Sequence, residues 1–457
     1  MGHMGKMSES RLTRVAVGAA VLALVAAGSF AVPTAANAAP VLGSPGADPV
    51  APSGQPAADA SKPGQRAVLS ARDAALIKRQ DALLPTAQDL AAQSRVESSD
   101  IAGVRLEVET DTVHVYRTET KQALRLATAA PAGVKVVVHP AKFSRNTMLR
   151  TAAAVTADAK LLGEQHVSVQ AVGPTVDGSG VDITVVAAKQ SEVADATSVL
   201  KQRYGAVIGK VTGTERRTSE RDLFFGGWRF NDYAPWFGGD RISSSAGGCS
   251  TGFYAVLSGA PVMLTAAHCG GVGTAFYNGP RTDGSFSFMG SSVYSNTSTD
   301  VGAISVTSAL STINVGPAEW STQLYVPTWS SPFVGEYLCQ SGSYTGETCG
   351  LYVVDTNQSV CISWFLWWCT GWQGPLADVV SIYGSGSYAA GHGDSGGPVY
   401  AYSGSSGVAK GLVHGVLTPN AAAAYPAYYP DNVWCPAPEG WSPRCSAGFS
   451  FAHMPGY

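Results

Sequence analysis

The stretch Gly391-His392-Gly393-Asp394-Ser395-Gly396-Gly397-Pro398 decides how the rest of this sequence is interpreted. It sets one serine among glycines, which adopt backbone angles that other residues resist. A serine in such a turn can present its hydroxyl outward, with backbone N–H groups nearby to hold a developing oxyanion. A hydroxyl is a weak nucleophile at neutral pH and needs an adjacent base. The stretch therefore predicts a nucleophile, provided that the chain also supplies a histidine and an acid.

Two upstream segments offer a base and an acid. Leu264-Thr265-Ala266-Ala267-His268-Cys269 places a histidine behind an apolar run, and Thr299-Asp300-Val301 places an aspartate at the start of a strand-like segment. The order along the chain is His268, Asp300, Ser395. Taken singly, each of them has a structural interpretation: a core histidine, a capping aspartate and a serine in a glycine turn.

These three segments together resemble the chymotrypsin-like serine proteases, and more closely their bacterial branch, the streptogrisins and alpha-lytic protease. The resemblance covers roughly residues 236–457. It implies an all-β double β-barrel with Ser395 as nucleophile, His268 as general base and then acid, and Asp300 orienting the imidazole. The N–H groups of Gly393 and Ser395 would form the oxyanion hole. The implied reaction is hydrolysis of protein or peptide substrates through an acyl-enzyme.

The same resemblance implies a substrate pocket in the C-terminal half. Its walls would be Ala389, Ala390, His392, Val413, His414 and Gly415. No acid stands near Ala389, which disfavours cleavage after Lys or Arg, so an apolar pocket for Phe, Tyr or Leu is the default expectation. His414 keeps a glutamate-accepting pocket open as a second option, because glutamate-specific relatives use a histidine in this wall. The Ser-Gly pair that the family usually carries in this segment is not evident here.

Two departures from the family pattern lie near the nucleophile. Ala389 and Ala390 stand where the bacterial enzymes often carry a cysteine, and Gln340 replaces the arginine that pairs with the aspartate before the nucleophile. That aspartate is Asp394, and a buried carboxylate without a partner is costly. We therefore expect Asp394 to find another partner. The candidates are Arg229, Arg241, Arg281, Lys410, Arg444, a new N-terminus or neutral donors.

All eight cysteines lie between 249 and 445. An even count behind a secretory signal predicts disulfides, although eight cysteines allow roughly a hundred pairings. Nearest-neighbour spacing suggests Cys249–Cys269, Cys339–Cys349, Cys361–Cys369 and Cys435–Cys445, and the resemblance supports the first two. The sequence has no CxxC pair, which disfavours a zinc site. We expect neither a metal nor a cofactor.

The N-terminal part is predicted to be a secretion signal followed by a linker. Arg11 and Arg14 precede the apolar run 15–32, and Ala36-Asn37-Ala38 fits a cleavage site, so residues 1–38 are predicted to be a signal peptide. Residues 39–66 are rich in Ala, Pro, Gly and Ser, which is typical of a disordered linker. A secreted, extracellular protein without a stable membrane anchor follows.

Residues 67–221 are predicted to form an α+β propeptide. Helical patterns cover 67–78 and 86–94, split at Pro85, then 145–162 and 191–204, with strands between them. This part has no cysteine and no catalytic cluster. The resemblance implies a propeptide that assists folding and inhibits the immature enzyme. The protease domain would be 222–457, with the cleaved junction between 216 and 236.

The charge balance excludes one class of partner. The net charge of −3 suggests no bulk affinity for nucleic acid. Residues 222–457 hold 5 Lys and Arg against 13 Asp and Glu, a net of −8, which leaves 25 and 20, a net of +5, in 1–221. A basic N-terminal part and an acidic C-terminal part could attract each other. We expect the mature enzyme to be a monomer.

Two other function classes remain open at this point. Gly393-x-Ser395-x-Gly397 also matches the nucleophile elbow of α/β-hydrolases, and an esterase could use Ser395 with Asp431 and His453. That fold needs a helix after the elbow, whereas Val399-Tyr400-Ala401-Tyr402 predicts a strand. The other class is a catalytically inactive, protease-like binding protein. The aromatic run Trp364-Phe365-Leu366-Trp367-Trp368 either covers the barrel or offers a surface for substrate or propeptide.

Overall fold

The structure is a computed structural model that describes residues 70–119, 131–214, 228–280, 283–318, 321–382, 388–416, 433–434 and 444–454. The signal peptide, the linker and most of the expected cleavage junction lie outside the described residues, so those expectations stay predictions. Within these ranges, no helix combines the length and the apolar character needed to cross a membrane.

The elements before residue 215 form an α+β N-terminal unit with two lobes. Its first lobe packs one long helix on a small sheet. The sheet has the order β1 (Ile101–Glu107), β2 (Thr112–Arg117), β3 (Lys135–Pro140), with β1–β2 antiparallel and β2–β3 parallel. Helix α1 (Ala71–Ser94) begins at Ser70, whose side chain accepts a hydrogen bond from the Asp73 N–H, a typical N-cap.

Helix α1 differs from the sequence prediction, because it continues through Pro85 instead of stopping there. Proline in a helix interior costs about 3 kcal/mol. The apolar stripe nevertheless runs unbroken past it, with Leu83, Leu84, Ala87 and Leu90 buried on the sheet. Burying each Leu side chain contributes about 1.5–3 kcal/mol, which offsets the cost of the proline.

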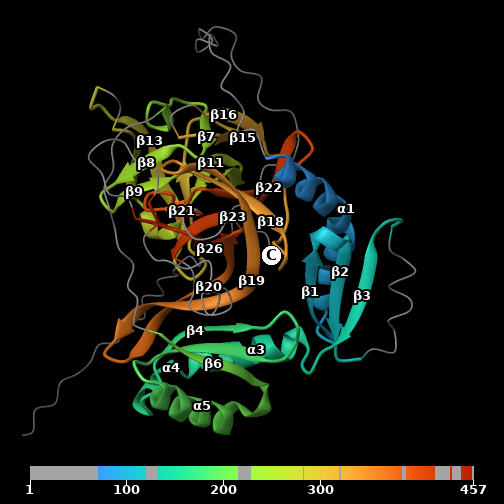
Figure 1. The fold of residues 1–457 in the computed structure, drawn as a ribbon. Helices are drawn as coiled ribbons and strands as arrows, with labels where there is room; N and C mark the ends of the chain where they lie inside the picture. Colours follow the sequence, from blue (N-terminus) through green and yellow to red (C-terminus); the bar gives the residue numbers. More distant parts are fainter. Residues whose placement is uncertain are drawn as a thin grey trace, which may run out of the picture. The chain divides into compact units, whose positions relative to one another are not determined.

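The second lobe repeats the theme of a small sheet covered by helices. Strands β4 (Val169–Pro174), β5 (Val181–Val186) and β6 (Ile208–Thr214) pair in that order. Helices α3 (Arg145–Ala157), α4 (Ala159–Glu164) and α5 (Gln190–Tyr204) accompany them (Figure 1). The predicted helix over 145–162 is thus two helices that meet at Asp158.

The first half of the β domain is a sheet of seven strands in the order β10-β11-β14-β13-β12-β8-β9. The strands are β8 (Arg241–Ser244), β9 (Gly247–Ser250), β10 (Tyr254–Leu257), β11 (Ala260–Thr265), β12 (Ala275–Asn278), β13 (Ser287–Asn296) and β14 (Val301–Ser305). It encloses an apolar cluster that includes Met263, Phe276 and Ile304. Strands β7 (Trp236–Gly238), β15 (Ala309–Val315) and β16 (Thr322–Tyr325) form a smaller sheet beside it.

The second half is a closed barrel, since six strands pair in the order β18-β22-β23-β26-β20-β19 and β19 pairs back to β18. Several of them appear as adjacent curved ribbons in Figure 1. The strands are β18 (Tyr337–Gly342), β19 (Gly346–Phe365), β20 (Trp368–Ser381), β22 (Pro398–Ser403), β23 (Ser406–Val416) and β26 (Gly448–His453). The short strand β17 (Thr328–Trp329) pairs with β23, and β21 (Ala390–Gly391), β25 (Arg444–Ser446) and β24 (Val433–Trp434) form a separate small sheet.

The two halves share a buried core. Leu264 and Ala303 of the first half belong to one apolar cluster with Tyr400 and Leu412 of the second. The seam between the halves is therefore packed, and loops from both can be held at fixed positions across it. The expected fold class, an all-β double barrel preceded by a small α+β unit, is confirmed.

Candidate active site

The first half of the β domain brings His268 and Asp300 together through strand pairing. Antiparallel pairing of β11 with β14 sets Thr265 opposite Gly302, so the end of one strand lies beside the start of the other. The chain then turns into the short 3-10 helix η4 (Ala267–Cys269), which carries His268, while Asp300 immediately precedes β14. Residues 32 apart in sequence thus become neighbours.

The Asp300 carboxylate makes two hydrogen bonds with His268. Its Oδ1 accepts a hydrogen bond from the His268 backbone N–H at 3.0 Å, and its Oδ2 lies 2.8 Å from Nδ1 of the ring. The backbone of Asp300 has φ 56°, in the left-handed region that aspartate tolerates better than most residues. Its carbonyl accepts from Ala267 N at 3.1 Å, which ties the turn to η4.

Asp300 is fully buried, yet its surroundings favour the ionised carboxylate. Burial alone would raise the pKa of its carboxyl, but the charges of His268 and His414 and their hydrogen bonds hold that pKa well below its usual range. A carboxylate only accepts hydrogen bonds, so Nδ1 of His268 must carry the proton. In a neutral ring, Nε2 is then the basic nitrogen.

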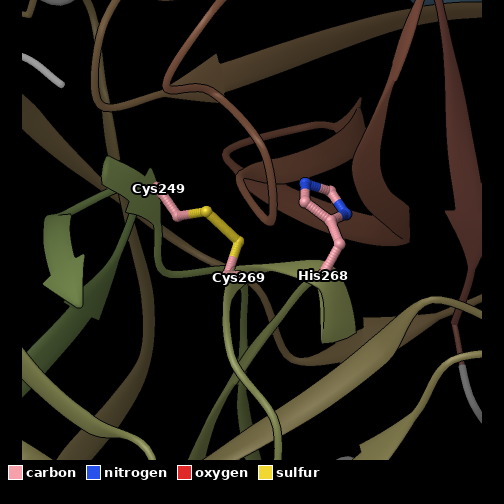
Figure 2. Close-up of side chains that lie close together, drawn as sticks. All are labelled: Cys249, His268 and Cys269. Carbon is pink, nitrogen blue, oxygen red and sulfur yellow. A yellow bond between two sulfur atoms is a disulfide. The ribbon is translucent and has the colours of Figure 1, made fainter. Parts of the chain in front are cut away.

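The nucleophile candidate, Ser395, lies on a turn of the other half of the domain, just before β22. Ser395 is half-buried, and its carbonyl accepts a hydrogen bond from Ser250 N at 2.8 Å. The Sγ atom of Cys269, the residue after His268, lies 3.8 Å from the same carbonyl. Cys269 is bonded to Cys249 at the end of β9, as Figure 2 shows, and this disulfide fixes the His268 turn to the adjacent strand.

The glycines around Ser395 have specific roles. Gly393 and Gly396 have φ values of 98° and 81°, in the region that favours glycine. The Gly393 carbonyl lies 2.8 Å from Ser250 Oγ, which holds that peptide unit, and Gly396 N donates to Val413 O at 2.8 Å. The loop is therefore a fixed turn between β21 and β22. Sequence reasoning did not single out Ser250, because no pattern marks a serine at a strand end as a partner of a distant loop.

Asp394 is satisfied by neutral donors. Its Oδ1 accepts from the N–H groups of Tyr344 and Thr345 at 2.9 and 3.0 Å. Its Oδ2 accepts from Thr345 Oγ1 at 2.6 Å and from Gly391 N at 2.8 Å. Burial raises the pKa of this carboxyl, while the hydrogen bonds act in the opposite sense. Arg241 adds a nearby charge: burial lowers its pKa to about 10, and the charge of Asp394 acts to raise it.

The expected pocket residues separate into three groups. Ala389, Ala390 and Val413 are buried in the apolar core of the second barrel. His392 and Gly415 are half-buried, and no atom lies within 4 Å of the position that a Cβ on Gly415 would take. His414 instead directs Nδ1 at Asp300 Oδ2, 2.6 Å away. Nothing in the sequence indicated that contact, because β23 and Asp300 meet only across the seam.

His268, Asp300 and His414 are close enough together to be tested as a metal site. Tetrahedral bonds of 2.0–2.1 Å would set neighbouring ligand atoms about 3.3 Å apart. The observed separations between nitrogen and oxygen are 2.8 and 2.6 Å, which are hydrogen-bond lengths. The arrangement fits two N–H donors on one carboxylate oxygen.

Three of the four suggested disulfides are present: Cys249–Cys269, Cys339–Cys349 and Cys361–Cys369. Cys445 is also disulfide-bonded, and its expected partner Cys435 lies outside the described residues. Cys445 Sγ borders Gly391, where an added Cβ would come within 2.6 Å of it. Cys445 therefore lies against the loop that carries Ser395, and its pairing with Cys435 stays a prediction.

The α/β-hydrolase alternative does not fit this geometry. Strand β22 follows Ser395, where a nucleophile elbow needs a helix. His453 lies on β26 with its Nε2 shut off from solvent, and burial lowers its pKa to about 4. Asp431 lies outside the described residues.

No protein-family model matches the chain, and no curated protein matches it in sequence. Solved structures do resemble it. Thermobifida fusca protease A is 20% identical with a TM-score of 0.33, and the match covers 48% of this chain and 91% of that one. Nocardiopsis protease is 23% identical with a TM-score of 0.33, over 48% and 92%. Cellulomonas bogoriensis chymotrypsin is 20% identical with a TM-score of 0.31, over 48% and 91%.

The strand pairing described above, and not these low TM-scores, identifies the fold. By that pairing, and by the chain order His268, Asp300, Ser395, this protein resembles the bacterial chymotrypsin-like serine proteases.

Proposed function

We propose that this chain is a secreted serine endopeptidase, made in an inactive prepro-form. The observation that carries the proposal is the buried carboxyl of Asp300, whose Oδ2 lies 2.8 Å from Nδ1 of His268, while the Ser395 turn is anchored to the adjoining strand end at Ser250. A base in a fixed tautomer beside a serine in a glycine turn is the arrangement that acyl transfer needs.

In the proposed mechanism, Nε2 of His268 takes the proton of the Ser395 hydroxyl as Oγ attacks the peptide carbonyl. The N–H groups of Gly393 and Ser395 stabilise the oxyanion. The imidazolium, paired with Asp300, returns the proton to the leaving amine. Water, deprotonated by His268, then attacks the carbonyl of the acyl-enzyme. Ser395 takes the proton back as it leaves, and the product with the new carboxyl end is released. No cofactor enters these steps.

An apolar residue before the cleaved bond is the proposed preference. Ala389, Ala390 and Val413 belong to the apolar core of the second barrel, so the segments that carry the expected pocket bring no charge from these positions. Asp394 turns its carboxylate inward to the 344–345 backbone, so it offers no charge to a substrate. Nδ1 of His414 is engaged by Asp300, which weakens the case for a pocket that selects glutamate.

The N-terminal unit is proposed to be the propeptide, which assists folding and inhibits the enzyme. Its β4 pairs with β19 of the barrel, with Val172 opposite Ser359 and Ala171 opposite Val360. On the other lobe, the Gln80 side chain exchanges hydrogen bonds with the backbone of Tyr337 at 3.0 and 2.6 Å. A unit that engages two barrel strands could template their pairing, which is slow because the contacts are non-local.

Active-site labelling with a fluorophosphonate probe tests the proposed activity. Secreted, processed wild type should be labelled, with peptide mapping placing the probe on Ser395, and the label should be lost in His268→Ala. Asp300→Asn should slow labelling by up to about 10⁴-fold, because the imidazole loses its tautomer and orientation. Label that survives loss of His268 would point to another base. A folded protein that takes no label would favour a binding role.

A further inference from the structure

Asp300 has a second imidazole partner. His414, on β23, places Nδ1 2.6 Å from Asp300 Oδ2, the same oxygen that lies 2.8 Å from Nδ1 of His268. The two rings meet edge to face, with centroids 5.9 Å apart and planes at 85°. The His414 side chain is 14% exposed and the Asp300 side chain is 0% exposed, so this contact is formed largely away from water.

A carboxylate can only accept hydrogen bonds, so the groups that contact Asp300 must be the donors. Asp300 accepts at Oδ1 from the His268 backbone and at Oδ2 from both rings, so each ring has its proton on Nδ1. The two donors of η4 hold one carboxylate oxygen each. The donor from β23 adds a second hydrogen bond to Oδ2 from the opposite half of the domain, which further restricts rotation about the Cβ–Cγ bond.

We propose that His414 is a positioning residue for the proposed protease reaction: its Nδ1–H fixes Asp300 Oδ2, which in turn keeps the His268 ring in the tautomer and orientation of a general base. This role rests on the proposed function. It differs from the substrate-wall role that the sequence suggested, because His414 then acts through Asp300 and touches no reacting atom.

The arrangement has an electrostatic consequence for pH dependence. Among the described residues, His268 from η4 and His414 from β23 are the ionisable side chains that act on Asp300. Strand β26, paired with β23, sets Ser450 and Phe451 opposite Gly415 and Val413, and neither carries a charge. The second hydrogen bond shares the negative charge of Oδ2 between two rings, so less of it stabilises a protonated His268.

Two variants separate the role in positioning from mere packing. His414→Phe keeps a ring but removes the donor, whereas His414→Asn keeps an N–H donor near the position of Nδ1. We expect His414→Phe to lower kcat by about tenfold, the worth of one hydrogen bond to a charged group, with little change in KM. The acid limb of its kcat/KM profile should move to higher pH, because His268 alone then faces the full carboxylate charge. His414→Asn should recover most of kcat and the wild-type limb.

The measurement is kcat and KM between pH 4 and 10 on matched peptides with Phe or Glu before the cleaved bond, with fluorophosphonate labelling of each variant. Unchanged kcat and acid limb, with altered preference between Phe and Glu, would overturn the proposal in favour of a substrate wall. Failure of His414→Asn to restore either quantity would also overturn it. Wild type without label on Ser395 would remove the protease function itself, whereas labelled wild type with indifferent variants removes only the role of His414.

Discussion

At the scale of single residues, the turn before Ser395 shows which donors meet Asp394 in place of the expected arginine. Gln340 stands where an arginine was expected to meet Asp394. Its side chain is instead turned to the 345–348 segment, with Nε2 2.8 Å from Thr345 Oγ1 and Oε1 accepting from Gly342 N at 2.7 Å. Asp394 in turn accepts from Thr345. A network of neutral donors thus shapes the 340–346 turn around the carboxylate.

Gly342 is required by this network, and its replacement is a direct test. A Cβ at that position would lie 2.2 Å from Oδ1 and 2.3 Å from Cγ of Asp394. Gly342→Ala should therefore destabilise the folded chain by about 1–3 kcal/mol, as overpacking does, and lower the melting temperature. Gly271→Ala is the matched control, because no atom lies within 4 Å of its added Cβ. Equal melting temperatures for the two variants would contradict the network.

At the scale of elements, the long hairpin of β19 and β20 links the two parts of the described chain. Its aromatic tip contacts α4, where Gly163 leaves room for Trp367 and Trp368, and Ser168 Oγ donates to Trp367 O at 2.5 Å. Phe365, Leu366 and Trp367 still remain about half exposed. The sequence left two roles open for this run, and the contacts with Gly163 and Ser168 place its tip against the N-terminal unit.

Gly163→Ala tests whether that contact holds the hairpin. The added Cβ would lie 2.8 Å from Trp368 Cβ and 3.0 Å from Trp367 Cδ1, so the hairpin must move away. In a Ser395→Ala background that prevents self-cleavage, we expect faster amide hydrogen exchange at 359–361 and 171–172. Glu164→Ala, an exposed neighbour on the same helix, should leave exchange as in wild type. Equal exchange in both variants would show that the hairpin does not depend on α4.

At the scale of the whole molecule, Arg229 marks which part of the chain belongs to the β domain. It is 1% exposed and donates to the carbonyls of Gly239, Gly316, Ser341 and Gly342. Its Nε also donates to Ser321 Oγ at 2.7 Å. A cut after Arg229 would separate its guanidinium from the domain and leave these buried carbonyls without hydrogen-bond donors. Unpaired buried carbonyls lower the stability of the fold.

We therefore predict that the mature protein begins at or before Arg229, which narrows the expected junction to 216–229. Mass spectrometry of the intact secreted protein would give the start directly. A start between 230 and 236 would contradict the prediction and would mean that the Arg229 site is dispensable. Ser395→Ala, analysed in parallel, shows whether the enzyme makes this cut itself, since the uncut chain should then accumulate.

The sequence predicted an all-β domain from its short apolar strands and glycine turns, and its resemblance to the chymotrypsin-like proteases implied the double barrel and singled out His268, Asp300 and Ser395. These are local features that a chain displays along its length. The sequence also placed three disulfides by nearest-neighbour spacing. The partners of Asp394 and the contact of His414 with Asp300 became visible in the folded structure, because both form where strands distant in sequence come together. It also overruled Pro85 as a helix end, because burial of the α1 stripe outweighs a local preference. Local chemistry can be read in order along a sequence, whereas partners across a seam depend on how non-local strands pair.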